Sequence, residues 1–346
     1  MSKVYVGMSG GVDSSVTAAL LKERGYDVTG VYMKNWTQDL PGMKCPWADD
    51  LADAKRVAVQ LDIPFKVFDF QKEYKQKVVD YMIEEYKAGR TPNPDIMCNQ
   101  EVKFKLFLEA ALEDGADMIA TGHYASTKNG ELLMAKDENK DQTYFLYRAT
   151  GEALEKTLFP LGEFKKPEVR KMAEERGLIT AKKKDSQGIC FVGKVGIRDF
   201  LQQYVEAKSG KIIDKTSGKT LGVHDGAIFY TIGQRHGLDV GGGLPYYVVG
   251  KNMKKNEVYV TTDLNDETLW RKELKLTNIH WINNEPEFTR SYQVRLRHRA
   301  KLINATLRKE GKQLFAELKD PERAITAGQS AVIYDDTTVV GGGIVY

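Results

Sequence analysis

The sequence predicts an α/β protein in three parts: an N-terminal parallel sheet covered by helices, a small mixed central part and a C-terminal antiparallel β-barrel. The first stretch of about 120 residues alternates strand-like and helix-like segments, which is typical of a parallel sheet with crossover helices. Residues 196–270 hold short segments between glycines. From about residue 273 short strands dominate, at a spacing typical of a small sandwich or barrel.

The N-terminal elements follow from apolar runs and their periodicity. We expect strands at 3–8, 27–33, 65–70 and 116–123. Apolar residues recur at helical spacing after the first strand, at Val16, Ala19 and Leu20. Further helices are expected at 48–62, 73–89 and 101–115. Residues 90–100 contain two prolines close together and are predicted to be an irregular connection.

The rest of the chain changes character after Leu178. Residues 179–193 are polar and contain glycine, so we expect a loop there. The C-terminal strands are expected at 275–282, 291–300, 313–318, 330–335 and 339–346. These shifts in pattern give predicted domains at 1–193, 194–271 and 272–346.

Composition limits the class of protein. The 346 residues are 42% hydrophobic and 29% charged, as in a soluble globular protein of two or three domains. No apolar run approaches the ~20 residues that span a bilayer, and no signal-peptide pattern opens the chain, so we expect a cytoplasmic protein without a membrane partner.

The net charge of +3 is small, but residues 289–313 carry 8 Lys+Arg against 1 Asp+Glu. Such a local block can contact a polyanion.

The segment "GMSGGVDSS", residues 7–15, lies between a predicted strand and a predicted helix. A strand, a glycine-rich turn and a helix N-terminus together present backbone N–H groups to an anion. Gly10 and Gly11 allow a close approach, and Ser9, Ser14 and Ser15 add hydroxyl donors. The lysine of the Walker pattern is absent, so γ-phosphoryl transfer by a P-loop mechanism is not expected.

The motif "SGGVDSS" resembles that of the PP-loop ATP pyrophosphatases, which predicts a Rossmann-like PP-loop domain. The resemblance implies cleavage of ATP between the α- and β-phosphates, with AMP passed to a substrate oxygen. Met33 lies at the predicted carboxyl edge of the sheet, where an adenine pocket or simple core packing would account for it. Mg²⁺ is expected with the triphosphate, and Asp13 is a candidate helper through metal or water. The implied ATP contacts are Gly7, Met8, Ser9, Gly10, Gly11, Val12, Asp13, Ser14, Met33 and Gly122.

Two segments centre on cysteines: "PNPDIMCNQEVKF" (92–104) and "KKDSQGICFVG" (183–193). Together with the loop they resemble the tRNA-specific 2-thiouridylase family (MnmA/TrmU) over essentially the whole chain. Further matching segments lie at 30–36, 120–125, 140–147, 231–238 and 328–334. The resemblance implies that sulfur replaces the C2 oxygen of the wobble uridine, position 34, in the lysine, glutamate and glutamine tRNAs. We expect a monomer.

The resemblance assigns a role to each of two cysteines. Cys190 would carry a persulfide loaded by a separate sulfur carrier, and Cys98 would attack the sulfur bond and leave a Cys98–Cys190 disulfide for a reductant to break. Lys182, Lys183 and Lys184 either favour the Cys190 thiolate or form a solvated face. Cys45 is a loop thiol or a third ligand of an iron–sulfur cluster, although no C-x-x-C spacing supports the cluster.

The resemblance also implies tRNA contacts, some with a structural alternative. Asp95 is a candidate acceptor for the uracil N3–H, a general acid/base, or a turn-forming residue after a proline. His123 is a tRNA contact or a structural histidine, and Asp141 is a contact or a helix N-cap. The family often has Tyr where Leu296 stands, so ring stacking is not available there. The implied contacts are Asn93, Pro94, Asp95, His123, Lys140, Asp141, Gln142, Arg295, Leu296 and Gln329.

The segment "SYQVRLRHRAK", 291–301, alternates apolar and cationic residues. A strand period of two places Tyr292, Val294, Leu296 and His298 on one face and Arg295, Arg297, Arg299 and Lys301 on the other. We expect the first face to pack into the barrel. The second either meets RNA phosphates, which position RNA without specifying its sequence, or only solubilises the surface.

Other functions compete with thiolation of C2. A PP-loop ligase or amidotransferase would adenylate its substrate and accept nitrogen, and it would need neither Cys98 nor Cys190. Synthesis of 4-thiouridine shares the loop. An RNA-binding protein with a vestigial nucleotide fold would bind tRNA without releasing pyrophosphate.

Overall fold

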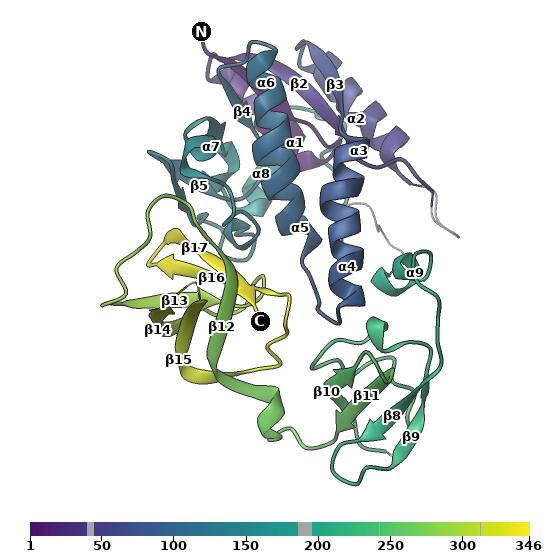
Figure 1. The fold of residues 1–346 in the computed structure, drawn as a ribbon. Coiled ribbons are helices and arrows are strands. Elements are labelled where there is room, and N and C mark those ends of the chain that lie inside the picture. The colour runs from purple at the N-terminus through teal and green to yellow at the C-terminus, as the bar shows by residue number, and fades with distance from the viewer. Residues whose placement is uncertain (40–44, 186–195, 242, 312) are drawn as a thin grey trace.

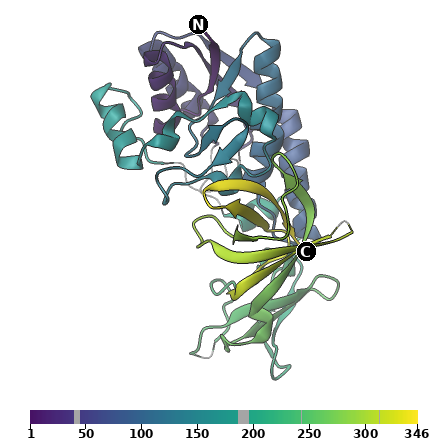
Figure 2. The same cartoon turned by 90° about the vertical axis from the view of Figure 1, so that its left-hand side faces the viewer.

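The computed structural model describes residues 1–39, 45–185, 196–241, 243–311 and 313–346. The N-terminal domain occupies one end of the molecule, and the barrel and the central part lie at the other end in both views (Figures 1 and 2). No helix within the described ranges is both long and apolar enough to cross a membrane.

The N-terminal sheet is parallel throughout, with strand order β3-β2-β1-β4-β7. Its strands are β1 (Lys3–Gly7), β2 (Asp27–Lys34), β3 (Phe65–Asp69), β4 (Met118–Ala120) and β7 (Thr157–Leu158). Alternate residues of β1 face opposite sides, as a strand requires. Val4 and Val6 belong to one apolar cluster and Tyr5 to the other. The sheet is therefore buried on both faces, as predicted for a parallel sheet.

Helices cover both faces of this sheet (Figure 1). On the Val4 side lie α1 (Val12–Glu23), α2 (Trp47–Gln60) and α8 (Lys166–Glu175). On the Tyr5 side lie two continuous helical runs. The first is α3 (Gln71–Tyr74), the π-helix η1 (Lys75–Asp80) and α4 (Tyr81–Lys87), and the second is α5 (Pro94–Met97), the π-helix η2 (Cys98–Phe107) and α6 (Leu108–Glu113).

The second run corrects the prediction of an irregular connection at 90–100, because the helix begins at Pro94. Proline is favoured at the first helical position, where its missing N–H costs nothing. The side chain of Asn93 accepts a hydrogen bond from the Asp95 N–H and caps the helix. The second of the two prolines, Pro94, therefore begins the helix.

Short elements complete the N-terminal domain and the central part. They are the hairpin β5 (Ser126–Lys128) and β6 (Glu131–Leu133), the helices α7 (Gly151–Glu155) and α9 (Ile197–Leu201), and the 3₁₀ turns η3 (Thr143–Phe145), η4 (Pro160–Glu163), η5 (Ala227–Phe229) and η6 (Glu267–Leu269). The central sheet has the order β10-β11-β8-β9 and mixes parallel and antiparallel pairs. Its strands are β8 (Gly210–Asp214), β9 (Thr220–His224), β10 (Tyr247–Asn252) and β11 (Glu257–Thr261).

The C-terminal strands form a closed antiparallel barrel in the order β12-β15-β14-β13-β16-β17, with β17 pairing back to β12. The strands are β12 (Trp270–Trp281), β13 (Ser291–Arg295), β14 (Ile303–Glu310), β15 (Gln313–Arg323), β16 (Ser330–Asp335) and β17 (Thr338–Val345). Strand β6 of the N-terminal domain also pairs with β17, which joins the two domains by backbone hydrogen bonds. The predicted fold class is confirmed.

Candidate active site

The glycine-rich loop leads from β1 into α1. Gly10 has φ 73°, and a Cβ there would collide with the backbone of Asp50 in α2. The Ser9 N–H donates to Ser14 Oγ at 3.2 Å, and Ser14 Oγ donates to the Gly11 carbonyl at 3.1 Å. These bonds close the loop over the first turn of α1, whose N–H groups have no partner within the helix. The loop has the form of an anion site, and the individual ATP contacts remain predictions.

Met33 and Gly122 lie beside this loop. Met33 is the second-last residue of β2, at the same edge of the sheet, and its Cε is 3.0 Å from where a Cβ on Gly7 would stand. A Cβ on Gly122 would lie 2.9 Å from the Asp13 carbonyl carbon and the Ser14 nitrogen. Only glycine therefore allows the segment after β4 to approach the first turn of α1 so closely.

A lysine from a distant helix reaches the loop, and sequence reasoning missed it. Lys166, the first residue of α8, places Nζ 2.7 and 2.8 Å from the two carboxylate oxygens of Asp13. The Tyr124 hydroxyl donates to Asp13 Oδ1 at 2.9 Å. The Lys166 side chain is 9% exposed. Nothing in "KKPEVR" distinguishes a buried lysine from a solvated one, because its partner is 153 positions away.

Lys166 also pairs with Asp185, at 2.9 Å. Lys140 and Arg170 contact the same carboxylate at 2.8 and 2.6 Å. Burial opposes ionisation of Asp185, but the hydrogen bonds from Lys140 and Lys166 outweigh it and lower the pKa to about 2. A series of ion pairs through Asp13, Lys166 and Asp185 thus connects the loop to residue 185, where the described range 45–185 ends.

Lys183 is half-buried and paired with two carboxylates, and its predicted role toward Cys190 stays a prediction. Its Nζ lies 2.8 Å from Asp50 and 2.7 Å from Asp53, both on α2. Burial opposes its charge, yet the two carboxylates raise its pKa. Cys190, predicted to carry the sulfur, falls outside the described residues.

Asp95 and Cys98 lie one turn apart where α5 passes into η2. Cys98 is 5% exposed. Burial raises the pKa of its thiol, Lys103 and the hydroxyl of Tyr74 lower it, and Asp95 raises it further. Burial likewise raises the pKa of Asp95 against the opposing charge of Lys103. The thiol and the carboxyl are therefore both held toward their protonated forms.

His123, a predicted tRNA contact, is buried with 9% of its surface exposed. Its ring packs against Phe104 and Phe159, with centroids 5.9 and 6.1 Å away. Nε2 lies 3.2 Å from Lys103 Nζ, and Nδ1 lies 2.7 Å from the Thr121 hydroxyl. Burial first, and Lys103 second, keep its pKa well below the ordinary value. A neutral His123 faces Lys103, and its contact with tRNA remains a prediction.

Cys45 is buried beside the Trp36 carbonyl, with Sγ 3.8 Å from that oxygen. Burial raises the pKa of its thiol. Within the described ranges, no three His, Cys, Asp or Glu side chains gather as they would around a metal ion. The predicted cluster ligand Cys190 lies outside those ranges.

Arg295 corrects the predicted cationic stripe. Strand β13 ends at Arg295, so the period of two does not continue through residue 301. Arg295 is buried and donates to Asp141 at 3.0 Å, and its guanidinium lies 5.1 Å from the Tyr334 ring centroid. Asp141 also accepts bonds from the Ala135 N–H and the Thr143 hydroxyl. Asp141 is thus the centre of a buried network and not a helix N-cap.

The neighbouring predicted contacts divide between surface and interior. Arg297, Arg299 and Lys301 are exposed, as predicted. Lys140 is committed to Asp185, and Gln142 accepts the Tyr124 N–H at 2.9 Å. These two residues hold the N-terminal domain together in this structure, so a role toward tRNA stays a prediction.

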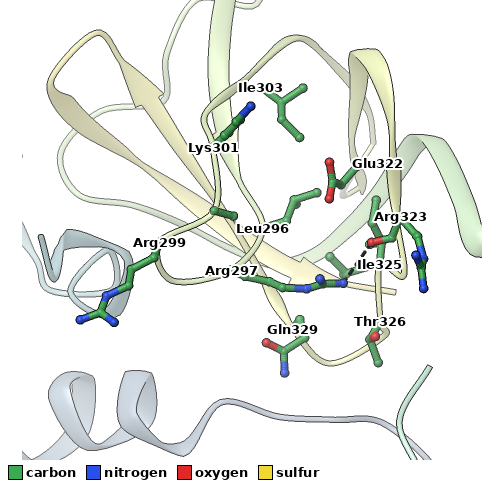
Figure 3. A pocket seen from close by; sticks show the side chains of 12 residues that line it. Leu296, Arg297, Arg299, Lys301, Ile303, Glu322, Arg323, Ile325, Thr326 and Gln329 are labelled. Carbon is green, nitrogen blue, oxygen red and sulfur yellow. Dashed lines mark hydrogen bonds between the residues drawn. The ribbon is translucent and has the colours of Figure 1, made fainter. Parts of the chain in front are cut away.

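A cavity of about 350 Å³ opens at one end of the barrel (Figure 3). Leu296, Arg297 and Gln329 line it, together with Arg323 and Thr326, which sequence reasoning missed. Arg297 donates to the Arg323 carbonyl at 3.0 Å, whereas Arg299, which also lines the cavity, turns its guanidinium away from that carbonyl and donates to the Asn139 carbonyl at 2.8 Å. A second cavity of about 330 Å³ shares Arg297, Thr326 and Gln329 and is completed by residues 231–234 of the central part. The segments 231–238 and 328–334, which both match the family, thus meet at this second cavity.

Residues 90 and 91 connect this region to Asp95. Gln329 Nε2 donates to the Thr91 carbonyl at 2.7 Å, and the Thr91 N–H donates to Ala327 at 2.9 Å. The Thr91 hydroxyl also contacts that of Thr231 at 3.3 Å. All three parts of the chain therefore meet directly before the Asn93–Pro94–Asp95 segment.

Family models match nearly the whole chain. Residues 2–194 match the tRNA methyl transferase HUP domain, 198–262 the tRNA methyl transferase PRC-barrel domain and 271–345 the aminomethyltransferase beta-barrel domain. A solved 4-thiouridine synthetase–RNA complex with bound ATP matches with a TM-score of 0.40 at 19% identity, covering 59% of this chain and 50% of that one.

Full-length relatives are much closer. The tRNA-specific 2-thiouridylase MnmA of Bacillus mycoides (strain KBAB4) is 48% identical over 352 residues, covering 99% of this chain and 94% of the relative. The protein of the same name from Streptococcus thermophilus (strain CNRZ 1066) is 47% identical over 355 residues, covering 99% and 95%. The chain belongs to the MnmA family of tRNA-specific 2-thiouridylases.

Proposed function

We propose that this tRNA sulfurtransferase replaces the C2 oxygen of the wobble uridine, position 34, with sulfur in the lysine, glutamate and glutamine tRNAs. The observation that carries the proposal is the full-length identity of 48% to a named 2-thiouridylase. The site agrees with it chemically, because a phosphate loop and a cysteine with a neighbouring carboxyl lie in one domain.

Activation is the first step of the proposed reaction. The uracil C2 oxygen attacks the α-phosphorus of ATP, the bond to the β-phosphate breaks, and pyrophosphate leaves into the loop of residues 7–14. AMP on the oxygen makes it a good leaving group. Among the described residues, the first turn of α1 and the buried Lys166 are suited to an anion there.

Mg²⁺ is expected to enter with ATP and to neutralise phosphate charge. Asp13 is the loop's carboxylate, and both of its oxygens already bond Lys166. Mg²⁺ usually keeps several waters and binds substrate phosphates. We therefore assign it no ligand from this chain.

Sulfur transfer is the second step. The terminal sulfur of a Cys190 persulfide, supplied by a sulfur-carrier protein, attacks C2 and AMP leaves with the bonding electrons of the C2–oxygen bond. The Cys98 thiolate then attacks the Cys190 sulfur, and the electron pair of the broken sulfur–sulfur bond goes to the sulfur on C2. The products are 2-thiouridine, AMP and a Cys98–Cys190 disulfide, which a dithiol reductant reopens.

The direct test is mass spectrometry of nucleosides from tRNA incubated with the full chain, ATP, Mg²⁺ and a persulfide donor. We expect 2-thiouridine at position 34, formed only with ATP, together with AMP. A methylated nucleoside, as the family-model description suggests, would overturn the proposal, and so would 4-thiouridine, which chromatography separates from its isomer.

The exposed cations at the barrel cavity are expected to contact RNA phosphates. Replacing Arg297 and Arg299 by Ala removes two such charges. The plot of log affinity for tRNA against log salt has a negative slope, and its magnitude should decrease by about 1 to 2. The measurement is filter binding over a salt series. Lys272→Ala with Lys309→Ala removes two exposed barrel charges that do not line the cavity and should leave the slope unchanged. Equal slopes in all three proteins would contradict the placement.

A further inference from the structure

Lys103 lies in η2 with Cys98, and the proposed reaction assigns it no role. Its Nζ lies 3.2 Å from Nε2 of His123, the residue after Gly122. Gly122 in turn touches the first turn of α1. Lys103 thus reaches from η2 toward the nucleotide side of the domain.

The π-helical geometry of η2 aligns Lys103 with the thiol. A π-helix closes its hydrogen bonds between residues i and i+5, so side chains five positions apart lie on one face. Cys98 and Lys103 have this spacing within η2. In an α-helix the same spacing would turn Lys103 well away from Cys98, because 3.6 residues complete a turn.

Lys103 forms no close ion pair among the described residues, although its charge acts on the carboxyl of Asp95. Among the described residues, no acidic side chain lies within 4.0 Å of its Nζ, whereas Lys105 on the same segment pairs with Glu101 at 3.8 Å. Its hydrogen-bond partner His123 has a pKa held far below its usual value. Since an ammonium only donates, Nε2 accepts from Lys103 and Nδ1–H donates to Thr121.

We propose that Lys103 is a positioning residue whose ammonium, held by neutral His123, stabilises the thiolate of Cys98. The inference rests on the proposed function in one respect: that reaction requires the Cys98 thiolate to attack the Cys190 sulfur. The step itself is an ionisation: the thiol proton leaves to solvent and no other bond changes.

The groups that face the thiol support this assignment. Burial and Asp95 raise the pKa of Cys98, while Lys103 and the Tyr74 hydroxyl lower it. Lys103 is therefore the cation that opposes the burial of Cys98. A nearby opposite charge favours the ionised form of a thiol.

The test measures the pH dependence of Cys98 alkylation by iodoacetamide in the pre-reduced full chain, with Cys98 quantified by peptide mass spectrometry. The midpoint reports thiolate formation, and the limiting rate at high pH reports access to the buried sulfur. We expect Lys103→Met to raise the midpoint by about one pH unit. Alkylation at a fixed pH below both midpoints should then slow by about tenfold.

Two variants separate charge from structure. Lys103→Arg keeps the cation and should keep the midpoint near that of the wild type. Lys105→Met removes an exposed charge from the same segment and should not move it. An unchanged midpoint in Lys103→Met, or an equal rise in Lys105→Met, would overturn the proposal. No ATP or tRNA is present, so failure here is distinct from failure of the nucleoside assay.

Discussion

Replacing either Cys98 or Cys190 by serine is expected to abolish 2-thiouridine formation while ATP binding persists. A hydroxyl cannot carry the transferable sulfur that Cys190 is proposed to hold, and it does not ionise to a nucleophile near neutral pH as a thiol does. The loop of residues 7–14 is unchanged in both variants. The measurements are nucleoside mass spectrometry with a persulfide donor and calorimetric titration with ATP.

Cys45→Ser is the matched control for these two variants. The Cys45 thiol lies beside the Trp36 carbonyl, to which a serine hydroxyl can also donate. We expect this variant to keep thiolation. Loss of activity in it would favour the cluster in which Cys45 is a third ligand. Retained thiolation in Cys190→Ser would refute the persulfide step, and a nucleoside that gains nitrogen instead of sulfur, formed by a Cys98→Ser/Cys190→Ser chain, would favour an amidotransferase-type reaction.

The sequence predicted those parts of the fold that depend on local pattern. Alternating strand and helix signals correctly indicated a sheet buried on both faces, since Val4, Tyr5 and Val6 all lie in the core. The glycine loop was recognisable because its conformation depends on residues next to one another, as Gly10 with φ 73° illustrates. The barrel followed from the spacing of its short strands.

The missed features depend on contacts between distant residues. Lys166 lies near the loop only because α8 packs beside α1, and its sequence neighbours give no sign of this. The role inferred for Lys103 depends on a π-helical register that periodicity of 3.6 does not reveal. Arg295 lies on the face of β13 opposite Tyr292 and Val294, as the period of two predicts, but Asp141 of the N-terminal domain covers that face and buries the guanidinium, which local pattern cannot reveal.

Breaking the buried Arg295–Asp141 pair should cause the largest loss of stability among single changes in the barrel. The two side chains are 8% and 0% exposed, and they join β13 to the 135–143 segment of the N-terminal domain. Removing one partner of a buried pair leaves an uncompensated charge and typically costs about 3–5 kcal/mol. We expect Arg295→Met to lose that much in urea unfolding followed by tryptophan fluorescence, to which Trp270 and Trp281 in β12 contribute.

An exposed pair of the same barrel supplies the control. Lys309 and Glu285 are 44% and 41% exposed, so Lys309→Met should cost less than about 1 kcal/mol. Similar losses of unfolding free energy in the two variants would show that the buried Arg295–Asp141 pair stabilises the protein no more than an exposed pair does.

The loss in Arg295→Met should also depend on pH in a defined direction. Burial raises the pKa of Asp141, and Thr143, the Ala135 N–H and Arg295 oppose that rise. Without Arg295 the pKa rises further, so the folded variant holds this proton more tightly than the unfolded chain does. Ionising Asp141 then costs stability as the pH rises from the ordinary aspartate pKa of about 3.9 through the raised value. The difference from the wild type should be larger at pH 8 than at pH 5, and a deficit that shrinks with rising pH would mean that Asp141 is not the charge left unpaired.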